Sequence, residues 1–214
     1  MKYNTFKNKI SRFPIITADH LQDLTSNEQV LRNQLTGWRK KGLVSRLRRG
    51  VYLLNKNDRK VNPSKLYLAN VLYAPSYVSL EYALFFYHLI PEKVADVTSV
   101  SAKKTASFSN EFGLFRYQHV KHDLFFGFKK LTDENNYPVL IAEPEKAAVD
   151  FFYLNSEIFT KKNMPDIFGE SYRFQNLSGL RKKRLWEYAS RCGQAKLKEI
   201  VKAFVLFIED EEGA

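Results

Sequence analysis

Cysteine is almost absent from this chain of 214 residues, in which Cys192 carries the single thiol. One cysteine excludes an internal disulfide and a cysteine-rich zinc site, and it favours a reducing compartment. The first 20 residues contain no apolar stretch of the length found in signal peptides. No later run approaches the roughly 20 apolar residues that a membrane-spanning helix needs. We therefore expect a cytoplasmic protein.

The chain also lacks the residue patterns of the common catalytic sites. Lys103, Lys104 and Thr105 follow no glycine-rich loop, so they do not form a phosphate-binding loop. His119 and His122 lack a nearby thiol, and the adjacent carboxylate points away on a strand, so we interpret them as surface or turn residues. We expect no enzymatic activity, no bound metal and no cofactor.

Acidic residues are scarce at one end of the chain. Residues 1–60 contain 14 Lys and Arg but only four Asp and Glu, a net charge of +10. The whole chain carries a formal charge of +11, so residues 61–214 are nearly neutral. Because concentrated positive charge attracts polyanions, this asymmetry predicts a nucleic-acid-binding unit joined to a neutral second part.

Three helices are predicted in the basic region. Apolar residues at helical spacing indicate a first helix over 4–12, and Thr17 is placed to cap a second helix that extends to Leu24. Ser26 and Gln29 form a capping-box pattern that opens a third helix. Gly42 is placed to end this third helix.

The third helix has one apolar face, because its apolar residues recur at intervals of three and four. These residues are Val30, Leu31, Leu35 and Trp38. After the helix, strand-like runs at 44–47 and 51–54 flank the basic tip Arg48-Arg49-Gly50, which predicts a hairpin. Three helices followed by a hairpin is the element order of a winged helix-turn-helix, and we assign residues 1–56 to such a domain.

The opposite face of the third helix is polar and carries side chains of the kind that read DNA in the major groove. Arginine pairs with guanine through two hydrogen bonds, and asparagine or glutamine pairs with adenine. Residues near the start of such a helix reach base edges, whereas later residues and the hairpin hold phosphates. The predicted base-reading residues are Gln29, Arg32, Asn33 and Thr36. The predicted phosphate-binding residues are Arg39, Lys40, Arg46, Arg48 and Arg49.

Double-stranded DNA is therefore the expected partner of this unit, although two other interpretations stay open. Winged-helix folds also act as protein-docking modules, and basic surfaces are often only solvated.

Trp38 and Tyr52 lie in register with apolar neighbours, so we interpret them as core residues rather than as base-stacking groups.

Residues 62–214 are predicted to form a mixed α/β domain, which follows the polar segment 55–62, interpreted as an exit linker. Helices are predicted from Asn62-Pro63, over 79–89, after Glu143, and over about 180–191 and 195–209. Strands are predicted in the segments VTSVS, FGLFRY, LFFGF and YPVLIA. We interpret the basic cluster 181–184 as a solvated face. The predicted fold class is α+β, an N-terminal winged helix followed by a mixed α/β domain with C-terminal helices.

One segment, AEPEKAAVD, concentrates charged residues. They are Glu143, Glu145, Lys146 and Asp150. Some metal-dependent nucleases contain such groups, so a nucleic-acid-processing enzyme remains an alternative. Pro144 at the first helical position, with acidic groups in the first turn, instead predicts an ordinary helix start, and we favour that interpretation.

Three segments, GLVSRLRRGVYLL, YVSLEYALFFYHLIPEKVADVTSVSAKKT and AEPEKAAVDFFYL, carry a family resemblance. The first contains Arg-Gly-Val-Tyr at 49–52. The second contains Ser-x-x-x-Ala-Leu at 79–84, and the third contains Glu-Lys-x-x-x-Asp at 145–150. In this order, over roughly residues 5–155, they resemble the AbiEi-like antitoxins of bacterial type IV (abortive-infection) toxin–antitoxin systems.

This resemblance implies a winged helix that binds repeats in the promoter of its own operon and represses it. Because a single winged helix spans a short half-site, two copies on an inverted repeat would supply useful affinity and specificity, so dimerisation on DNA is an option. It also implies that residues 62–214 counteract a nucleotidyltransferase-type toxin without forming a stable complex with it. A rival reading is a winged-helix transcription factor whose second domain senses a ligand or a partner. The neighbouring gene and a nuclease assay would separate these alternatives.

Overall fold

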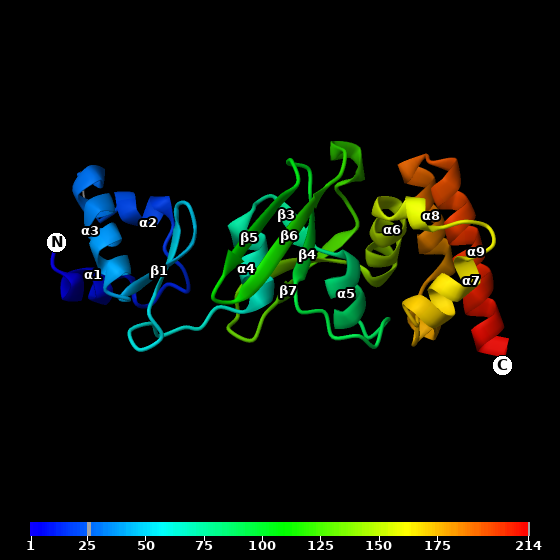
Figure 1. Ribbon diagram of the computed structural model, residues 1–214, viewed down its shortest axis with the longest axis horizontal. Coiled ribbons are helices and arrows are strands. Elements are labelled where there is room, and N and C mark those ends of the chain that lie inside the picture. The colour runs from blue at the N-terminus through cyan, green and yellow to red at the C-terminus, as the bar shows by residue number, and fades with distance from the viewer. Residues whose placement is uncertain (25–26, 214) are drawn as a thin grey trace.

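The computed structural model describes residues 1–24 and 27–213. The molecule is elongated, and its two termini lie at opposite ends (Figure 1). A small helical unit with a hairpin forms the N-terminal end, a six-stranded sheet lies in the middle, and a group of helices forms the C-terminal end. The architecture is α+β, as the sequence predicts.

The N-terminal unit, residues 1–56, contains the three helices and the hairpin predicted there. Its elements are α1 (Tyr3–Ile10), α2 (Ala18–Gln22), α3 (Glu28–Lys40), β1 (Val44–Arg48) and β2 (Val51–Leu54). The two strands pair antiparallel, and Gly50 in the turn between them has a φ of +80°. Glycine adopts this left-handed conformation without steric cost, so Gly50 suits the tip of the hairpin.

Local capping fixes where α2 and α3 begin. Thr17 and His20 form a capping box at the start of α2, in which the Thr17 backbone N–H donates to His20 Nδ1 at 3.3 Å. At the start of α3, the Asn27 side chain accepts a hydrogen bond of 3.1 Å from the Val30 N–H. Ser26, the predicted capping residue, lies outside the described residues. Asn27 therefore caps α3 within the described part of the chain.

The core of the N-terminal unit joins α1, α3 and the hairpin. Its buried residues are Phe6, Ile10, Ile16, Leu31, Leu35, Trp38, Val44 and Leu54. Trp38 packs against Tyr3 and Phe6, with ring centres 5.5 Å and 4.7 Å apart, and Tyr52 packs partly buried against the same core. The core roles predicted for Trp38 and Tyr52 are confirmed. The prediction for Val30 is wrong, because that side chain is 47% exposed.

The polar segment after the hairpin is attached to α1. Asp58 accepts hydrogen bonds from the Tyr3 hydroxyl at 2.6 Å and from Lys7 Nζ at 3.0 Å. These two bonds hold the pKa of the Asp58 carboxyl below its usual range. The segment interpreted as an exit linker is therefore fixed to the N-terminal unit as far as Asp58.

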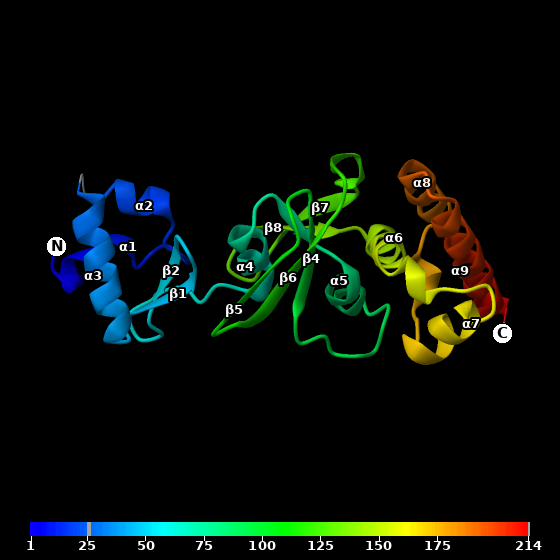
Figure 2. The same cartoon turned by 45° about the horizontal axis from the view of Figure 1, so that its top comes forward.

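The central sheet has helices packed on both of its faces. Its strands are β3 (Ser76–Val78), β4 (Val97–Ser101), β5 (Ala106–Asn110), β6 (Gly113–His119), β7 (Phe128–Thr132) and β8 (Pro138–Ala142). The strand order is β5-β6-β4-β3-β8-β7, with β4 parallel to β6, β3 parallel to β8 and the other neighbours antiparallel. Helix α4 (Lys65–Leu72) packs on β3 and β8, and α5 (Leu80–Phe86) packs on β4 from the opposite face (Figure 2).

The sequence pattern does not predict β3 or β5, and it places a strand before β7 instead of at β7. β3 has only three residues, all buried, and β5 is an edge strand of alternating half-buried and exposed residues. The segment LFFGF does not form the predicted strand. Its first residue ends the 3-10 turn His122–Leu124, and only its last residue, Phe128, belongs to β7. Gly127, with a φ of +73°, breaks the extended conformation before Phe128.

The helix predicted from Asn62-Pro63 begins slightly later. Ser64 caps α4, because its hydroxyl accepts a hydrogen bond of 3.1 Å from the Tyr67 N–H. The same hydroxyl donates to Asp133 at 2.5 Å. This contact links the start of α4 to the segment that follows β7.

The C-terminal end is a group of helices that begins with α6. Its helices are α6 (Pro144–Leu154), α7 (Met164–Asp166), α8 (Lys182–Cys192) and α9 (Ala195–Gly213). A cluster of aromatic rings joins α6 to α9, and Phe152 and Phe204 lie at its centre with ring centres 5.0 Å apart. No helix in the described ranges has the length and apolar character needed to cross a membrane.

Candidate nucleic-acid interface

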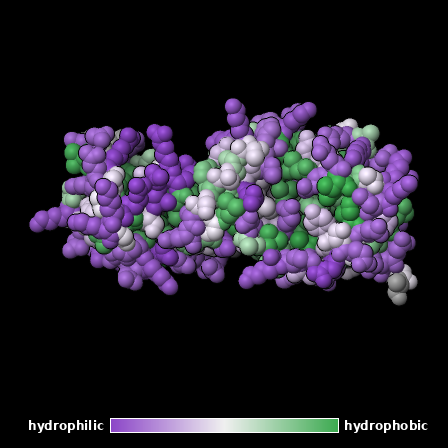
Figure 3. Space-filling view, in the orientation of Figure 1, coloured by the Kyte–Doolittle hydropathy of each residue, from purple (hydrophilic) through white to green (hydrophobic). Residues whose placement is uncertain are grey.

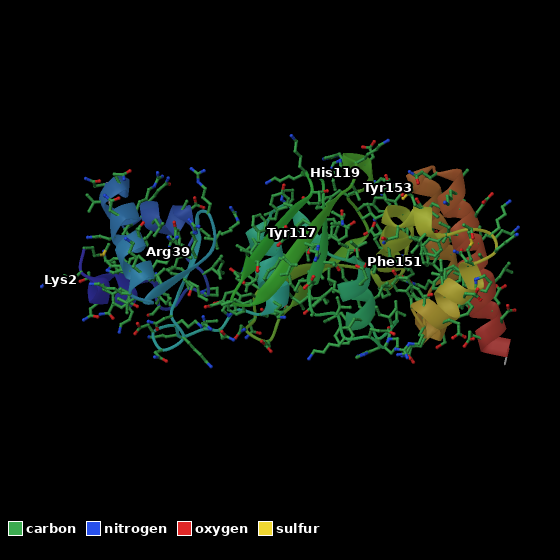
Figure 4. All side chains as sticks on the ribbon, viewed as in Figure 1. Lys2, Arg39, Tyr117, His119, Phe151 and Tyr153 are labelled. Carbon is green, nitrogen blue, oxygen red and sulfur yellow. The ribbon has the colours of Figure 1, made fainter. Side chains whose placement is uncertain are left out.

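Helix α3 presents its polar face to solvent because its apolar face is anchored from behind. Leu31, Leu35 and Trp38 are buried against α1 and the hairpin. The predicted contact residues on α3 are all exposed, and Arg39 is labelled on this helix in Figure 4. They are Gln29, Arg32, Asn33, Thr36, Arg39 and Lys40.

Three of the four predicted base-reading side chains form hydrogen bonds along the helix. Gln29 Nε2 donates to Asn33 Oδ1 at 3.3 Å, one helical turn away. The Thr36 hydroxyl donates to the Arg32 carbonyl oxygen at 3.0 Å. Such exposed hydrogen bonds exchange readily with other partners, since water and protein groups contribute nearly equal energies. Gln29 and Asn33 can therefore turn outward together toward a base edge.

A groove of about 370 Å³ lies between α2, α3 and the hairpin. Arg32 and Thr36 line it from α3, and Arg46 and Arg49 line it from the hairpin. Among the described residues, none that lines the groove is acidic. The groove thus gathers two predicted base-reading residues and two predicted phosphate-binding residues around one electropositive space.

Helix α2 forms the third wall of this groove, which the sequence interpretation did not foresee. Ala18, Leu21 and Gln22 line it. The signal for this role was weak, because α2 is only five residues long and contains no Lys or Arg. On the face shown in Figure 3, hydrophilic residues cover most of the N-terminal unit, including the region of α2 and the hairpin.

A bulge in β1 separates the predicted hairpin cations. Arg46 pairs with Tyr52 and Arg48 pairs with Val51, so the register shifts between the two arginines. A bulge re-aims the side chains that follow it. Arg46 is exposed and lines the groove, whereas Arg48 is half-buried and does not line it.

Arg48 instead faces the central sheet. Its Nη1 donates to the Arg49 carbonyl oxygen at 2.9 Å, and its enclosed Nε has no hydrogen-bond partner within the described chain. Burial raises the pKa of Tyr117 on β6, and the nearby positive charge of Arg48 opposes part of that rise. The structure therefore brings eight of the nine predicted residues to the solvent-facing side of the unit and places Arg48 apart from them.

The hairpin also docks on the central sheet. Glu111, in the turn between β5 and β6, accepts hydrogen bonds of 3.1 Å from Ser45 and from Arg59. Apolar hairpin residues add to this contact, because Leu47 and Val51 belong to the large core of the central sheet rather than to the small N-terminal core. One surface of the hairpin thus borders the groove while the other is built into the body of the protein.

The charged segment AEPEKAAVD has a different environment. Glu145 is 1% exposed and accepts hydrogen bonds from the backbone N–H of Arg181 at 3.1 Å and from its Nε at 2.8 Å. Burial alone would raise the pKa of Glu145, but the bonds from Arg181 and from the backbone bring it below its usual range. Glu145 therefore ties the start of α6 to the start of α8.

Glu143 has a similar role beside it. It accepts hydrogen bonds from Arg184 and, at 2.7 Å, from the Tyr188 hydroxyl. Burial opposes ionisation of Glu143, yet Tyr188 and Arg184 keep the pKa of its carboxyl below the usual range. Arg181 is exposed, as the interpretation of 181–184 as a solvated face expects, but Arg181 and Arg184 also bind these two carboxylates.

The last two charged residues of the segment form a buried pair. Lys146 is fully buried and donates to Asp150, which lies one turn further along α6. Asp150 also accepts hydrogen bonds from the Tyr77 hydroxyl at 2.9 Å and from the Ser79 hydroxyl at 2.8 Å. All three carboxylates of the segment are thus engaged by groups of the same chain, and Pro144 begins α6 as the helix-start interpretation predicts.

No group of three or more His, Cys, Asp or Glu residues in the described chain is arranged to hold a metal ion. Comparison of the chain with protein-family models and with curated proteins gives no match. The basic groove and the exposed face of α3 are therefore the features on which a functional argument rests.

Proposed function

We propose that this protein is a DNA-binding transcriptional autorepressor whose residues 1–56 form a winged helix-turn-helix. The observation that carries the proposal is the electropositive groove, which gathers Arg32, Arg46 and Arg49 from two elements. In winged helices the third helix enters the major groove of DNA and the hairpin follows the backbone. The order of three helices and a hairpin, with the groove between them, fits that mode of binding.

In this mode each part of the surface has a separate task. Gln29 and Asn33 face outward on α3 and read base edges, with Arg32 and Thr36 beside them. Arg46 and Arg49 hold one phosphate strand at the groove, and Arg39 and Lys40 hold the backbone at the end of α3. Arg48 is left out of this assignment, because it faces the central sheet.

We further propose that residues 62–214 act as the antitoxin of a type IV toxin–antitoxin system and counteract a nucleotidyltransferase-type toxin. The support is the resemblance to AbiEi-like antitoxins, and two of its segments meet in the structure. Ser79 begins the Ser-x-x-x-Ala-Leu motif and Asp150 ends the Glu-Lys-x-x-x-Asp motif, and their side chains are hydrogen-bonded at 2.8 Å. The shared motifs thus correspond to one buried contact between α5 and α6.

Binding of the purified protein to the DNA upstream of its own coding sequence tests the repressor proposal. The upstream duplex is compared with a scrambled duplex of the same composition over a series of salt concentrations. We expect tighter binding to the upstream duplex at every salt concentration and a linear fall of log affinity with log salt. Equal affinity for both duplexes would reduce the proposal to nonspecific binding.

Coexpression tests the antitoxin proposal separately. The adjacent gene, which this proposal expects to encode a nucleotidyltransferase, is induced with and without this chain, and cell growth is measured. Rescue by full-length protein and by the DNA-binding variant Arg46→Ala/Arg49→Ala is expected, because the two activities lie in different units. Failure of both proteins to rescue growth would favour a transcription factor with a sensing domain instead.

A further inference from the structure

Helix α3 contains a glycine whose presence the folded chain does not explain. Gly37 lies in the interior of Glu28–Lys40, where glycine is less favourable than alanine. A Cβ built at Gly37 meets nothing within 4 Å, and Gly37 does not have a positive φ. Neither packing nor backbone conformation therefore requires glycine at this position.

Gly37 is half-buried and lies at the edge of the exposed face of α3. Residues three or four positions apart are neighbours on a helix surface, so Gly37 is next to Asn33 and Lys40. Both of these side chains are exposed. Two turns earlier on nearly the same line is Val30, which is also exposed. Gly37 is thus a shallow point between a proposed base-reading residue and a proposed phosphate-binding residue.

The charge of α3 decides what kind of molecule can come close to this point. Helix α3 and the residue after it, residues 28–41, contain four Lys and Arg and one acidic residue, which is the first residue of the helix. A second copy of the same face would bring these positive charges together, which is unfavourable. A polyanion would be attracted to them, so nucleic acid is the occupant that this surface favours.

We infer that Gly37 is the position at which bound DNA comes closest to the backbone of α3, and that it determines specificity. This inference rests on the proposed DNA-binding function. The missing side chain lets α3 enter the major groove deeply enough for Asn33 to reach a base edge. A methyl group at position 37 would hold the helix away from the bases while leaving contacts between hairpin and phosphates in place. Base recognition would then be lost before general affinity.

Gly37→Ala tests this inference because it should weaken specific DNA binding while it raises the thermal stability of the protein. A preferred duplex is first selected from a random duplex pool with the wild-type protein. Gly37→Ala should bind this duplex at least about 5-fold more weakly, comparable to one mismatched base pair, and bind scrambled duplex with unchanged affinity. The same substitution should raise the thermal unfolding midpoint by about 2 °C, since alanine is the better helix former.

Gly179→Ala is the matched control. Gly179 also has open space around a built Cβ and lacks a positive φ, but it lies in the 3-10 turn Leu177–Gly179 at the C-terminal end. This variant should bind both duplexes like the wild type. Unchanged discrimination by Gly37→Ala, with a wild type that discriminates, would overturn the inference and leave the proposed function intact. A wild type that selects no preferred duplex would overturn both.

Discussion

Ser79 and Asp150 are 71 positions apart in the sequence, and the Ser79 hydroxyl donates to Asp150 Oδ2 at 2.8 Å. Asp150 accepts a second hydrogen bond from the Tyr77 hydroxyl at the same oxygen and pairs with Lys146 through its other oxygen. A buried carboxylate is tolerated only when paired and hydrogen-bonded, and Asp150 satisfies both conditions. This contact joins the end of β3 to the middle of α6.

The first prediction concerns this buried pair. Asp150→Ala leaves the ammonium group of Lys146 without a counter-charge in the core, so we expect a loss of about 3–5 kcal/mol in the free energy of unfolding. Urea denaturation measures it. The double variant Lys146→Met/Asp150→Leu removes both charges and should recover a large part of that loss. A double variant as unstable as Asp150→Ala would show that the pair is not what Asp150 contributes.

A second prediction follows from the close approach of Gly127 to Lys146. A Cβ at Gly127 would lie 2.9 Å from Lys146 Cγ, and Gly127 has a φ of +73°. A left-handed alanine alone is expected to lower the free energy of unfolding by about 1–2 kcal/mol. Gly127→Ala should therefore lower it by more than this. Gly42→Ala supplies the comparison, since Gly42 has a φ of +68° and open space around it. Equal losses in urea denaturation would contradict the steric argument.

The hairpin arginines should have different roles in DNA binding. Arg49→Ala should weaken binding to every duplex and reduce the salt slope by about one unit, because one phosphate contact is lost. Arg48→Ala should leave both the affinity and the slope nearly unchanged, because Arg48 faces the sheet. Salt titrations of both variants against one duplex decide this point. Equal effects of the two substitutions would place Arg48 back at the phosphate backbone.

The last prediction concerns pH. The Tyr3 hydroxyl and Lys7 hold the pKa of Asp58 below its usual value near 4, so their contacts stabilise the fold above that pH. This stabilisation is lost as the pH falls through the folded pKa. Asp58→Asn should lower the free energy of unfolding by about 1 kcal/mol at about pH 7, and by progressively less as the pH falls toward about 3.

The control for Asp58 is the exposed pair of Asp96 and Arg116, which are 2.9 Å apart with side chains 36% and 54% exposed. Asp96→Asn should change the unfolding free energy by well under about 1 kcal/mol at either pH, because water screens this pair. Urea denaturation of both variants at both pH values separates the two cases. A pH-independent loss in Asp58→Asn would mean that its charge is not involved.

The elements that depend on neighbours in the sequence were the predictable ones. Thr17, at a helix start, and Pro144, at a first helical position, mark α2 and α6 through local chemistry, and the spacing of Leu31, Leu35 and Trp38 gives the buried face of α3. Local patterns also indicated the hairpin. The exposure of Val30 was not predictable in this way, because it depends on tertiary packing and not on the spacing of apolar residues along the helix.

Some of the misses come from contact between distant parts of the chain. Arg181 reaches Glu145 across 36 positions, and Asp58 reaches Tyr3 across 55. The bulge that turns Arg48 away from Arg46 depends on the pairing of β1 with β2 and has no residue signature of its own. Edge strand β5, with exposed serines, gives little apolar signal to recognise. The residue types of a proposed DNA-contact surface are thus more predictable than the directions in which their side chains point.

The hairpin that borders the groove also shares its buried side with the central sheet through Leu47 and Val51. A duplex held in that groove would therefore meet the whole elongated body at one fixed angle. Two copies on an inverted repeat would each project their C-terminal helices along directions set by the helical phase of the DNA. The spacing between half-sites would then decide whether the two bodies point to the same side of the duplex or to opposite sides. Insertion of five base pairs, about half a turn, would reverse that arrangement.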